Sequence, residues 1–292
     1  MFIKHKKDEI TYYTSNLLDN YGISHFFASK NGGVSKGCFE SLNVSTARKD
    51  ENGLCDKKEN VYENIRRALS VINSLPRNSI CTKQVHKANV FVPNDTYAGF
   101  GTSIDLPEVE DCDAVFIPSK LPFPDTACVK TADCVPILIA DKITGNVCAV
   151  HAGWRGTVCD IVTRAIKTMD ACPENILCAI GPCIKSCCYS VGKEVYDSTL
   201  ELFSKKGLTD RISKVFTQKG SKLYADLALI NFYLLQSCSI PSQNIDVCDM
   251  CTCCTKDSGG QNIFFSHRAM NCHSGTFLSG IKTFTPFKEE MR

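Results

Sequence analysis

The sequence contains few histidines, no long apolar run and no concentration of basic residues. Its 292 residues include six histidines, and no two of them form a His-x-His pair. No apolar stretch approaches the roughly 20 residues that cross a bilayer, and residues 1–8 are charged, unlike a secretory signal. Lys and Arg are scattered and number 33 against 31 Asp and Glu, so the basic surface of a nucleic-acid-binding protein is not expected. These absences favour a soluble protein with a small-molecule substrate and with neither a membrane nor a nucleic acid as partner.

Cysteine, by contrast, is frequent, with 19 residues. A secreted disulfide scaffold is usually much shorter and has an even number of regularly spaced cysteines. Several cysteines lie inside apolar runs, including Cys128, Cys148, Cys159 and Cys178, where a free thiol behaves as a small hydrophobic side chain. We therefore expect mostly reduced cysteines and a cytoplasmic location.

The chain has no internal repeat and no long linker, so we expect one domain over residues 1–292. Short apolar runs alternate with amphipathic segments, which is typical of a mixed α/β fold. Apolar spacing predicts helices at 158–169, 191–203 and 225–236, and another that reaches residue 72 after a capping box at Asp56 and Glu59. Strands are predicted for residues 80–85, 114–117, 128–131, 135–140, 147–150, 176–180 and 263–266.

Residues 131–157 are the most informative segment, because two apolar runs flank a polar turn at 141–146 and so predict a β-hairpin. Cys134 begins the first run and His151 ends the second. A turn centred between residues 142 and 143 places the two directly opposite each other, whereas a four-residue loop at 142–145 places them diagonally. Both registers put them on one face, and only a one-residue bulge would separate them.

His86 follows the predicted strand 80–85 and would supply a third ligand to the same site. One Cys and two His form a sound zinc set, and three protein ligands leave the fourth position for water or substrate, as in catalytic sites. Zinc in such a site lowers the pKa of its bound water to roughly 7. The alternative is that these are ordinary residues at the ends of strands.

Polar groups that suit a substrate surround these three residues in the sequence. Gly153 and Arg155 lie in a glycine-rich turn before a predicted helix, where backbone N–H groups and a guanidinium favour an anion. Asp133 is interpreted either as a proton acceptor or substrate contact, or as a cap of the next segment. Gly33 and Asn43 belong to another glycine-rich polar loop that is a candidate wall of the same pocket.

A second cysteine group, Cys248, Cys251, Cys253 and Cys254, raises the question of another metal site. Four thiolates within seven residues are too crowded to surround one tetrahedral ion without partners from elsewhere in the chain. Both a structural zinc or iron–sulfur site and a group of free thiols stay open at this point.

Taken together, these segments resemble the YfiH/YlmD family of bacterial laccase-domain proteins, relatives of human FAMIN. The resemblance runs from about residue 24 to residue 281, and its most specific parts are the ADCVP and HAGWRG segments that contain Cys134 and His151. The segments that carry it, in chain order, are Gly32-Gly33-Val34-Ser35, Ser41-Leu42-Asn43, Gln84-Val85-His86, Thr131-Ala132-Asp133-Cys134-Val135-Pro136, His151-Ala152-Gly153-Trp154-Arg155-Gly156, Ile180-Gly181-Pro182, Cys188-Tyr189-Ser190-Val191, Cys251-Thr252 and Ser266-His267-Arg268.

The resemblance implies an α+β fold in which two mixed sheets pack together and are flanked by helices, similar to the catalytic domain of cytotoxic necrotizing factors. It assigns the zinc ligands to His86, Cys134 and His151. It implies phosphorolysis of adenosine, inosine and methylthioadenosine and deamination of adenosine, with purine nucleosides and phosphate as partners and a monomer or homodimer as the assembly. Substrate-binding residues are expected among the shared segments, namely Gly33, Asn43, Gln84, Gly153, Arg155, Ser266 and Arg268.

Two positions depart from the family pattern. Lys30 stands where the family usually has Arg, and residues 274–276 read Ser-Gly-Thr where it tends toward Thr-Gly-Arg. The absence of a basic residue at Thr276 puts a phosphate contact from that loop in question.

Three other functions are weighed against the nucleoside enzyme. A copper polyphenol oxidase, the family's other label, is disfavoured because multicopper sites need many histidines, mostly in His-x-His pairs. A metal-free cysteine hydrolase would use Cys134 as nucleophile and His151 as its base. A protein that only binds nucleosides ranks last, because a metal position open to substrate beside an anion pocket favours catalysis.

Overall fold

Two six-stranded mixed sheets form the centre of the protein, which we describe from a computed structural model covering residues 1–286. The first sheet has the order β1-β2-β3-β15-β7-β4 and the second the order β14-β10-β8-β9-β6-β5, while β11-β13-β12 form a small third sheet. Both large sheets are mainly antiparallel, with parallel pairs only at β4–β7, β5–β6 and β10–β14. The strands are β1 (Phe2–Lys7), β2 (Ile10–Ser15), β3 (His25–Ala28), β4 (Ser79–Cys81), β5 (Val90–Phe91), β6 (Ala114–Ile117), β7 (Thr126–Thr131), β8 (Val135–Asp141), β9 (Val147–Ala152), β10 (Ile176–Ile180), β11 (Ser190–Val191), β12 (Phe216–Lys219), β13 (Lys222–Ala225), β14 (Ile245–Val247) and β15 (Phe277–Lys282).

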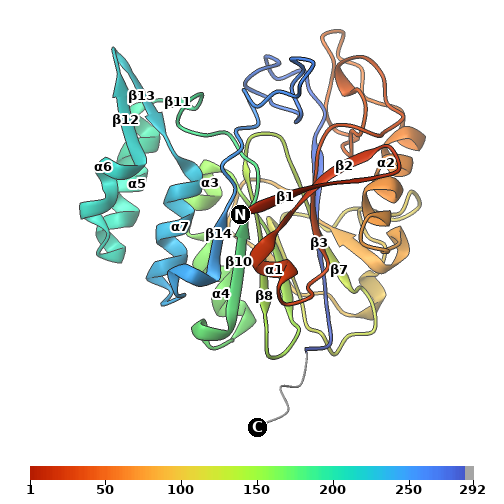
Figure 1. The fold of residues 1–292 in the computed structure, drawn as a ribbon, viewed down its shortest axis with the longest axis horizontal. Helices are drawn as coiled ribbons and strands as arrows, with labels where there is room; N and C mark the ends of the chain where they lie inside the picture. Colours follow the sequence, from red (N-terminus) through yellow and green to blue (C-terminus); the bar gives the residue numbers. More distant parts are fainter. Residues whose placement is uncertain (287–292) are drawn as a thin grey trace.

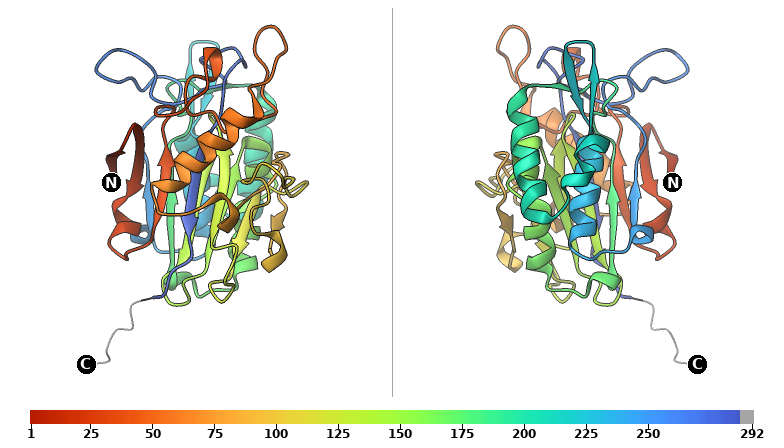
Figure 2. Two further views of the ribbon diagram at one scale, coloured as in Figure 1. Left: turned by 90° about the vertical axis from the view of Figure 1, so that its right-hand side faces the viewer. Right: turned by 90° about the vertical axis from the view of Figure 1, so that its left-hand side faces the viewer.

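Helices cover the outer faces of the two large sheets (Figure 1). Helix α2 packs on the first sheet, and α4 and α7 pack on the second. The two side views in Figure 2 show α2 in front of one face and α5 and α7 in front of the opposite one. The helices are α1 (Asn16–Asp19), α2 (Lys58–Ser70), α3 (Trp154–Val158), α4 (Ile161–Met169), α5 (Lys193–Lys206), α6 (Ile212–Val215) and α7 (Leu227–Ser237).

Strand alternation explains why both faces of these sheets are apolar. In β8, Ile137 and Ile139 face the helices, whereas Leu138 and Ala140 belong to the core between the two sheets. Successive side chains of a strand point to opposite faces, so a strand covered on both sides reads as a continuous apolar run. The predicted architecture of two packed mixed sheets flanked by helices is confirmed; the likeness to cytotoxic necrotizing factors stays a prediction.

Two of the predicted helices are confirmed and two need correction. The segments 191–203 and 225–236 correspond to α5 and α7. The segment 158–169 is not one helix, because Asp160 adopts a left-handed conformation (φ 64°) between α3 and α4. The capping box is wrong as well: α2 begins without a side-chain cap, since Asp56 instead accepts hydrogen bonds from the side chains of Ser35 and Asn43.

Five of the seven predicted strands are present, with ends shifted by two residues at most. The strand predicted at 80–85 ends already at Cys81, and residues 263–266 form no strand. Sequence patterns also missed β1, β2, β3 and β15, which are four of the six strands of the first sheet. Among the helices of residues 1–286, none has the length and apolarity needed to cross a bilayer.

Candidate metal centre and substrate cavity

The β8–β9 hairpin places Cys134 and His151 on one face of the second sheet. Its register pairs Pro136 with His151, which confirms the four-residue loop and shows that the tighter turn is wrong. The loop closes by a hydrogen bond from the Gly145 N–H to the Asp141 carbonyl oxygen. Cys134 precedes Pro136 by two residues, so it lies diagonally across from His151 and on the same side of the sheet.

His86 reaches the same place from an irregular segment, and the prediction that it ends a strand is wrong. Its φ is 60°, a left-handed conformation. The backbone N–H groups of Val85, His86 and Lys87 donate to the Asp113 carboxylate at 3.2, 2.9 and 2.8 Å from its nearest oxygens. The chain curls around this carboxylate because three consecutive N–H groups find their acceptor there and not on a neighbouring strand.

The three predicted ligands converge. One ligand atom each of His86, Cys134 and His151 lies within 4.8 Å of the others. His86 Nε2 is 3.8 Å from Cys134 Sγ, and the two imidazole rings cross at 85° with centroids 4.8 Å apart. Tetrahedral zinc with ordinary Zn–S and Zn–N bonds places sulfur and nitrogen about 3.6 Å apart. The donor set and its spacing therefore fit one zinc ion held by three protein ligands.

Asp113 is a functional residue that sequence reasoning missed. Its carboxylate is fully buried, and His151 Nδ1 lies 2.8 Å from it, which leaves Nε2 of the same ring for the metal. Metal-binding histidines are commonly oriented by such a carboxylate. The only signal was an Asp immediately before the predicted strand 114–117.

Cys134 and His151 shift each other's pKa in opposite directions. Burial alone would raise the pKa of Cys134, but the adjacent His151 and His86 lower it to about 6. Burial alone would lower the pKa of His151, but Cys134 and the hydrogen bond to Asp113 raise it to about 9. Without metal, the pair is a thiolate and an imidazolium near neutral pH. Zinc binding to this pair would displace the imidazolium proton.

Gly153 is the residue that allows the ligands to approach. A Cβ atom at this position would lie 2.9 Å from His86 Cδ2 and 3.1 Å from Cys134 Sγ. The predicted role of Gly153 in an anion-binding turn stays a prediction, but its position beside two metal ligands gives a separate reason for glycine.

A cavity of about 260 Å³ opens onto the three ligands. It is unusual in its unsatisfied polar groups: four of the five buried side-chain N or O atoms that lack a hydrogen-bond partner within residues 1–286 belong to residues lining it. Buried polar atoms are rarely left unpaired in folded proteins, so the wall of this cavity is unusual in holding polar groups that the protein itself does not satisfy. They are Thr82 Oγ1, Thr131 Oγ1, His267 Nδ1 and Thr276 Oγ1.

The cavity wall also carries positive charge. Arg48 lines it, as do Lys83, which is paired with Glu110, and Lys130, which is paired with Glu108. Burial, followed by the charge of Arg48, lowers the pKa of His267 to about 4, so its imidazole is neutral at pH 7. The cavity thus offers cationic groups for an anion and a neutral imidazole for an uncharged polar group.

Of the predicted substrate-binding residues, Gln84 lines this cavity. Its side-chain amide makes two hydrogen bonds of 2.7 Å with the backbone of Lys130. Arg155 lies elsewhere: it is exposed on α3, with its guanidinium 4.4 Å from the centroid of the Trp154 ring. Gly33 is half-buried and Asn43 is buried, and neither lines the cavity; the Asn43 side chain accepts from Thr276 N and donates to Asp56.

Asp133 and Arg268 are joined by a hydrogen bond near the cavity, and Ser266 lies in the same loop as Arg268. The Asp133 carboxylate accepts from Thr252 Oγ1 at 2.6 Å and from Arg268 N at 2.7 Å. The Arg268 guanidinium extends to the carbonyl oxygens of residues 188 and 190, and Ser266 Oγ accepts from the N–H of residue 269. These three residues hold the loops behind the cavity, and their side chains are not among those lining it.

Comparison with known families agrees with this site. A family model described as "Multi-copper polyphenol oxidoreductase laccase" matches residues 24–283. The chain belongs to this laccase-domain family. The predicted YfiH/YlmD membership is thereby confirmed.

Relatives of this laccase-domain protein carry the names of nucleoside enzymes. The "Purine nucleoside phosphorylase" of Bacteroides thetaiotaomicron is 30% identical over 279 residues, covering 94% of this chain and 97% of that protein. "Adenosine deaminase RL5", from an unknown prokaryotic organism, is 35% identical over 156 residues, or 52% of this chain and 56% of that protein. The solved structure of YlmD from Geobacillus stearothermophilus superposes with a TM-score of 0.82 at 26% identity, covering 98% and 100% of the two chains.

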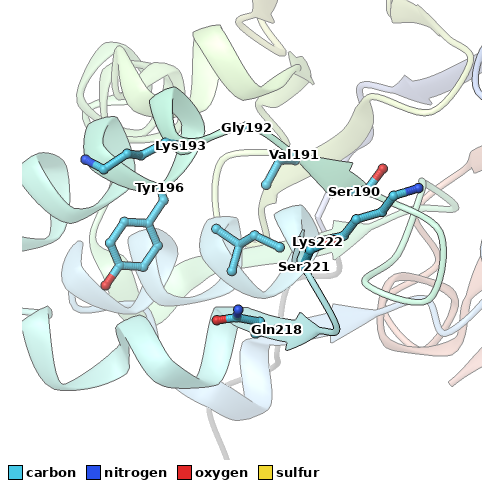
Figure 3. A pocket seen from close by; sticks show the side chains of 9 residues that line it. Ser190, Val191, Gly192, Lys193, Tyr196, Gln218, Ser221 and Lys222 are labelled. Carbon is cyan, nitrogen blue, oxygen red and sulfur yellow. The ribbon is translucent and has the colours of Figure 1, made fainter.

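A larger hollow on the laccase-domain chain has a different character. It measures about 690 Å³ and lies beside the three-stranded sheet, between side chains of β11, β12, β13 and α5 (Figure 3). Its lining includes Lys193, Tyr196 and Lys222 but no His, Cys, Asp or Glu. Size alone would favour this hollow, yet the groups suited to metal binding and proton transfer line the smaller one.

Proposed function

We propose that this laccase-domain chain is a zinc-dependent purine nucleoside enzyme and acts as one catalytic domain. The proposed reactions are phosphorolysis of adenosine, inosine and methylthioadenosine, and deamination of adenosine. The observation that carries the proposal is the convergence of His86, Cys134 and His151 at a cavity whose wall includes four polar side-chain atoms without a hydrogen-bond partner. The names of the relatives support the substrate class.

A bound zinc ion would supply a Lewis acid that activates water or polarises the substrate. The protein's own groups fix the geometry around it. Asp113 holds the His151 ring through Nδ1 and the segment of His86 through backbone N–H groups. Cys134 enters as a thiolate, since its neighbours lower its pKa to about 6.

Deamination of adenosine replaces the amino group at purine C6 with oxygen from water and releases ammonia. In the proposed complex, the unpartnered Nδ1 of His267 hydrogen-bonds the purine, and the neutral imidazole makes this contact without the cost of a buried charge. We assign Asp133 a positioning role, since both of its oxygens already accept hydrogen bonds from the loops behind the cavity.

Phosphorolysis adds phosphate to ribose C1′ and releases the purine base. Arg48 is the stronger candidate for holding that phosphate, because its guanidinium lines the cavity and is partly buried. Thr276 lines the same wall, where the family pattern tends toward a basic residue. We therefore assign the anion contact to Arg48, with Arg155 as the alternative from the sequence.

The decisive experiment is product analysis. The protein is incubated with adenosine, with and without phosphate, and the products are separated by chromatography. Phosphate-dependent adenine and phosphate-independent inosine are expected, and Cys134→Ala should abolish both together with zinc binding. Full activity in a metal-free Cys134→Ala variant would refute the proposal.

Paired arginine variants locate the phosphate. Arg48→Ala should raise the KM for phosphate and leave the rate of deamination nearly unchanged, whereas Arg155→Ala should change neither. If Arg155→Ala raised the KM for phosphate and Arg48→Ala did not, the phosphate contact would instead belong to the glycine-rich turn that contains Arg155.

A metal-free cysteine hydrolase is the second candidate, favoured by the half-buried thiol of Cys134 beside two imidazoles. Metal analysis distinguishes the two, because a stoichiometric ion would block the thiolate. A multicopper polyphenol oxidase is not favoured, since within residues 1–286 only one group of close metal-binding side chains contains histidine.

A further inference from the structure

We propose that Cys187, Cys188, Cys251 and Cys254 form a second metal site, a structural centre that binds one zinc ion through four thiolates. We call these residues the four-cysteine group. It shares no residue with the His86, Cys134 and His151 centre, and its argument does not depend on the proposed function.

The spacing of the sulfur atoms fits a single ion. All four Sγ atoms lie within 4.8 Å of one another, and those of Cys187 and Cys254 are 3.6 Å apart. Four thiolates around one tetrahedral zinc, with Zn–S bonds of about 2.3 Å, lie about 3.8 Å from each other. An iron–sulfur cluster would need more room, because several irons and bridging sulfides stand between its cysteines. The geometry therefore indicates a mononuclear centre.

Two segments far apart in the sequence build the four-cysteine group. Cys187 and Cys188 lie in a tight turn in which the N–H groups of residues 188 and 189 both donate to the carbonyl oxygen of Lys185. Cys251 and Cys254 have the Cys-x-x-Cys spacing that is common in structural zinc sites. The first segment supplies the partners that the crowded 248–254 cluster needs, and Cys248 and Cys253 stand outside the group.

Backbone contacts hold these two segments in register before any ion is added. The N–H of Thr252 donates to the carbonyl oxygen of Cys183 at 3.1 Å, which forms an isolated parallel bridge between residues 183 and 251. The N–H of Lys185 lies 3.4 Å from Cys251 Sγ. A backbone N–H aimed at a ligand atom is the usual support around a metal-binding thiolate.

Core packing does not account for the four-cysteine group. Cysteines in apolar cores are buried, as Cys128 and Cys148 are here, whereas Cys187 and Cys254 are exposed. Exposed thiols gain nothing from the hydrophobic effect, yet these two meet at 3.6 Å across 67 positions of sequence. A shared ion explains both their exposure and their convergence.

The position of the four-cysteine group gives the ion a structural task. Thr252, between two of the cysteines, donates to the Asp133 carboxylate at 2.6 Å. The Arg268 guanidinium donates to the Cys188 carbonyl oxygen at 3.2 Å, and its backbone N–H donates to the same Asp133. An ion bound there would clamp the loops that surround Asp133, the residue next to Cys134.

Zinc content of purified protein, produced with zinc and kept reduced, tests the proposal directly. The wild type should carry two equivalents per chain, Cys254→Ser and Cys187→Ser one each, and Cys134→Ala one. Cys253→Ser, in the same loop, and the exposed Cys172→Ser are matched controls that should keep two. Equal zinc content in wild type and Cys254→Ser, or loss of zinc in Cys253→Ser and not in Cys254→Ser, would overturn the assignment.

Spectroscopy gives a second readout that does not require variants of the four-cysteine group to fold. Cobalt incorporated into Cys134→Ala, in which only the four-cysteine group remains intact, should give the intense thiolate-to-metal absorption of a tetrahedral four-sulfur site. Absence of that absorption would refute the site, as would a Cys187–Cys254 disulfide found by peptide mapping of unreduced wild type.

Discussion

Replacing Asp113 with Asn would test how the metal centre is organised, because the change removes one charge and almost no volume. Oδ1 of the carboxylate accepts from His86 N and His151 Nδ1, and Oδ2 accepts from Val85 N and Lys87 N. An amide offers one acceptor oxygen and one donating NH₂ group. Whichever way it sits, two of the four N–H groups lose their acceptor and face a donor.

The size of the effect follows from burial. Asp113 is fully buried, so no solvent replaces the lost acceptor. A buried polar group left without its partner costs about 1–3 kcal/mol, so two such groups should lower the free energy of unfolding of the metal-free protein by about 2–6 kcal/mol. Loss of the carboxylate behind a metal-binding histidine weakens metal affinity by roughly 10–100-fold, or about 1.4–2.7 kcal/mol.

The assays are denaturant unfolding of metal-free protein and zinc titration against a competing chelator. Asp111→Asn is the matched control: it makes the same chemical change two residues away, at an exposed position whose left-handed backbone (φ 56°) asparagine tolerates. We expect the control to behave as wild type in both assays. If Asp113→Asn kept wild-type zinc affinity, the carboxylate would not be what orients His151, and the organisation of the centre described above would be wrong.

Three further results are expected. Gly153→Ala should weaken zinc binding by roughly 5- to 150-fold, because the added Cβ would lie 2.9 Å from His86 Cδ2 and such overpacking costs about 1–3 kcal/mol. The far-ultraviolet circular dichroism spectrum should stay unchanged. An unaltered zinc affinity would contradict the close approach of His86 to Gly153. The stability of metal-free protein should change little between about pH 6.5 and pH 9. Over that range the contribution of Cys134, whose pKa is lowered from 9.0 to about 6, grows as pH rises, while the contribution of His151, whose pKa is raised from 6.5 to about 9, is lost. Thermal melts across pH check this, and a pronounced maximum of stability inside the range would argue against it. Asn64→Ala should lower the free energy of unfolding by about 2–5 kcal/mol, because this fully buried amide makes four hydrogen bonds to residues 34–43. A change below about 1 kcal/mol, the net contribution of a single hydrogen bond, would show that the loop of residues 34–43 does not depend on Asn64.

The sequence revealed the parts of the site that are local. The β8–β9 hairpin joins neighbouring segments, and its apolar alternation ties Cys134 and His151 to one face whichever of the two registers forms. The strand at 114–117 and the helices at 191–203 and 225–236 also carry their signal within a short window. Helix 158–169 was predicted as continuous because apolar spacing persists across Asp160, where a single left-handed residue divides it.

Contacts between distant segments left no comparable signal. Strand β15 pairs with β3 across about 250 residues, and neither has a pattern that identifies its partner. Asp56 has the spacing of a helix cap, but its carboxylate is used by Ser35 and Asn43, which approach from another loop. Asp113 and the cavity wall likewise left no comparable signal in the sequence, because their roles arise only when several distant loops meet.

The two cysteine-containing centres meet at one peptide bond. Cys134 is a proposed ligand of the first centre, while the carboxylate of Asp133 is held by Thr252, which lies inside the Cys251-x-x-Cys254 segment of the proposed second centre. If that segment loses its order, the Thr252 hydroxyl leaves a buried carboxylate with only the Arg268 N–H, and an undercompensated buried charge destabilises its surroundings. The backbone at residue 133 is itself constrained, with φ 92°, so relaxation there would shift the adjacent thiolate. Because His86 and Cys134 lie outside the strands, a second ion that fixes the loops beside Cys134 would make the proposed first centre more precise, and this coupling gives the four-cysteine group a reason to lie where it does.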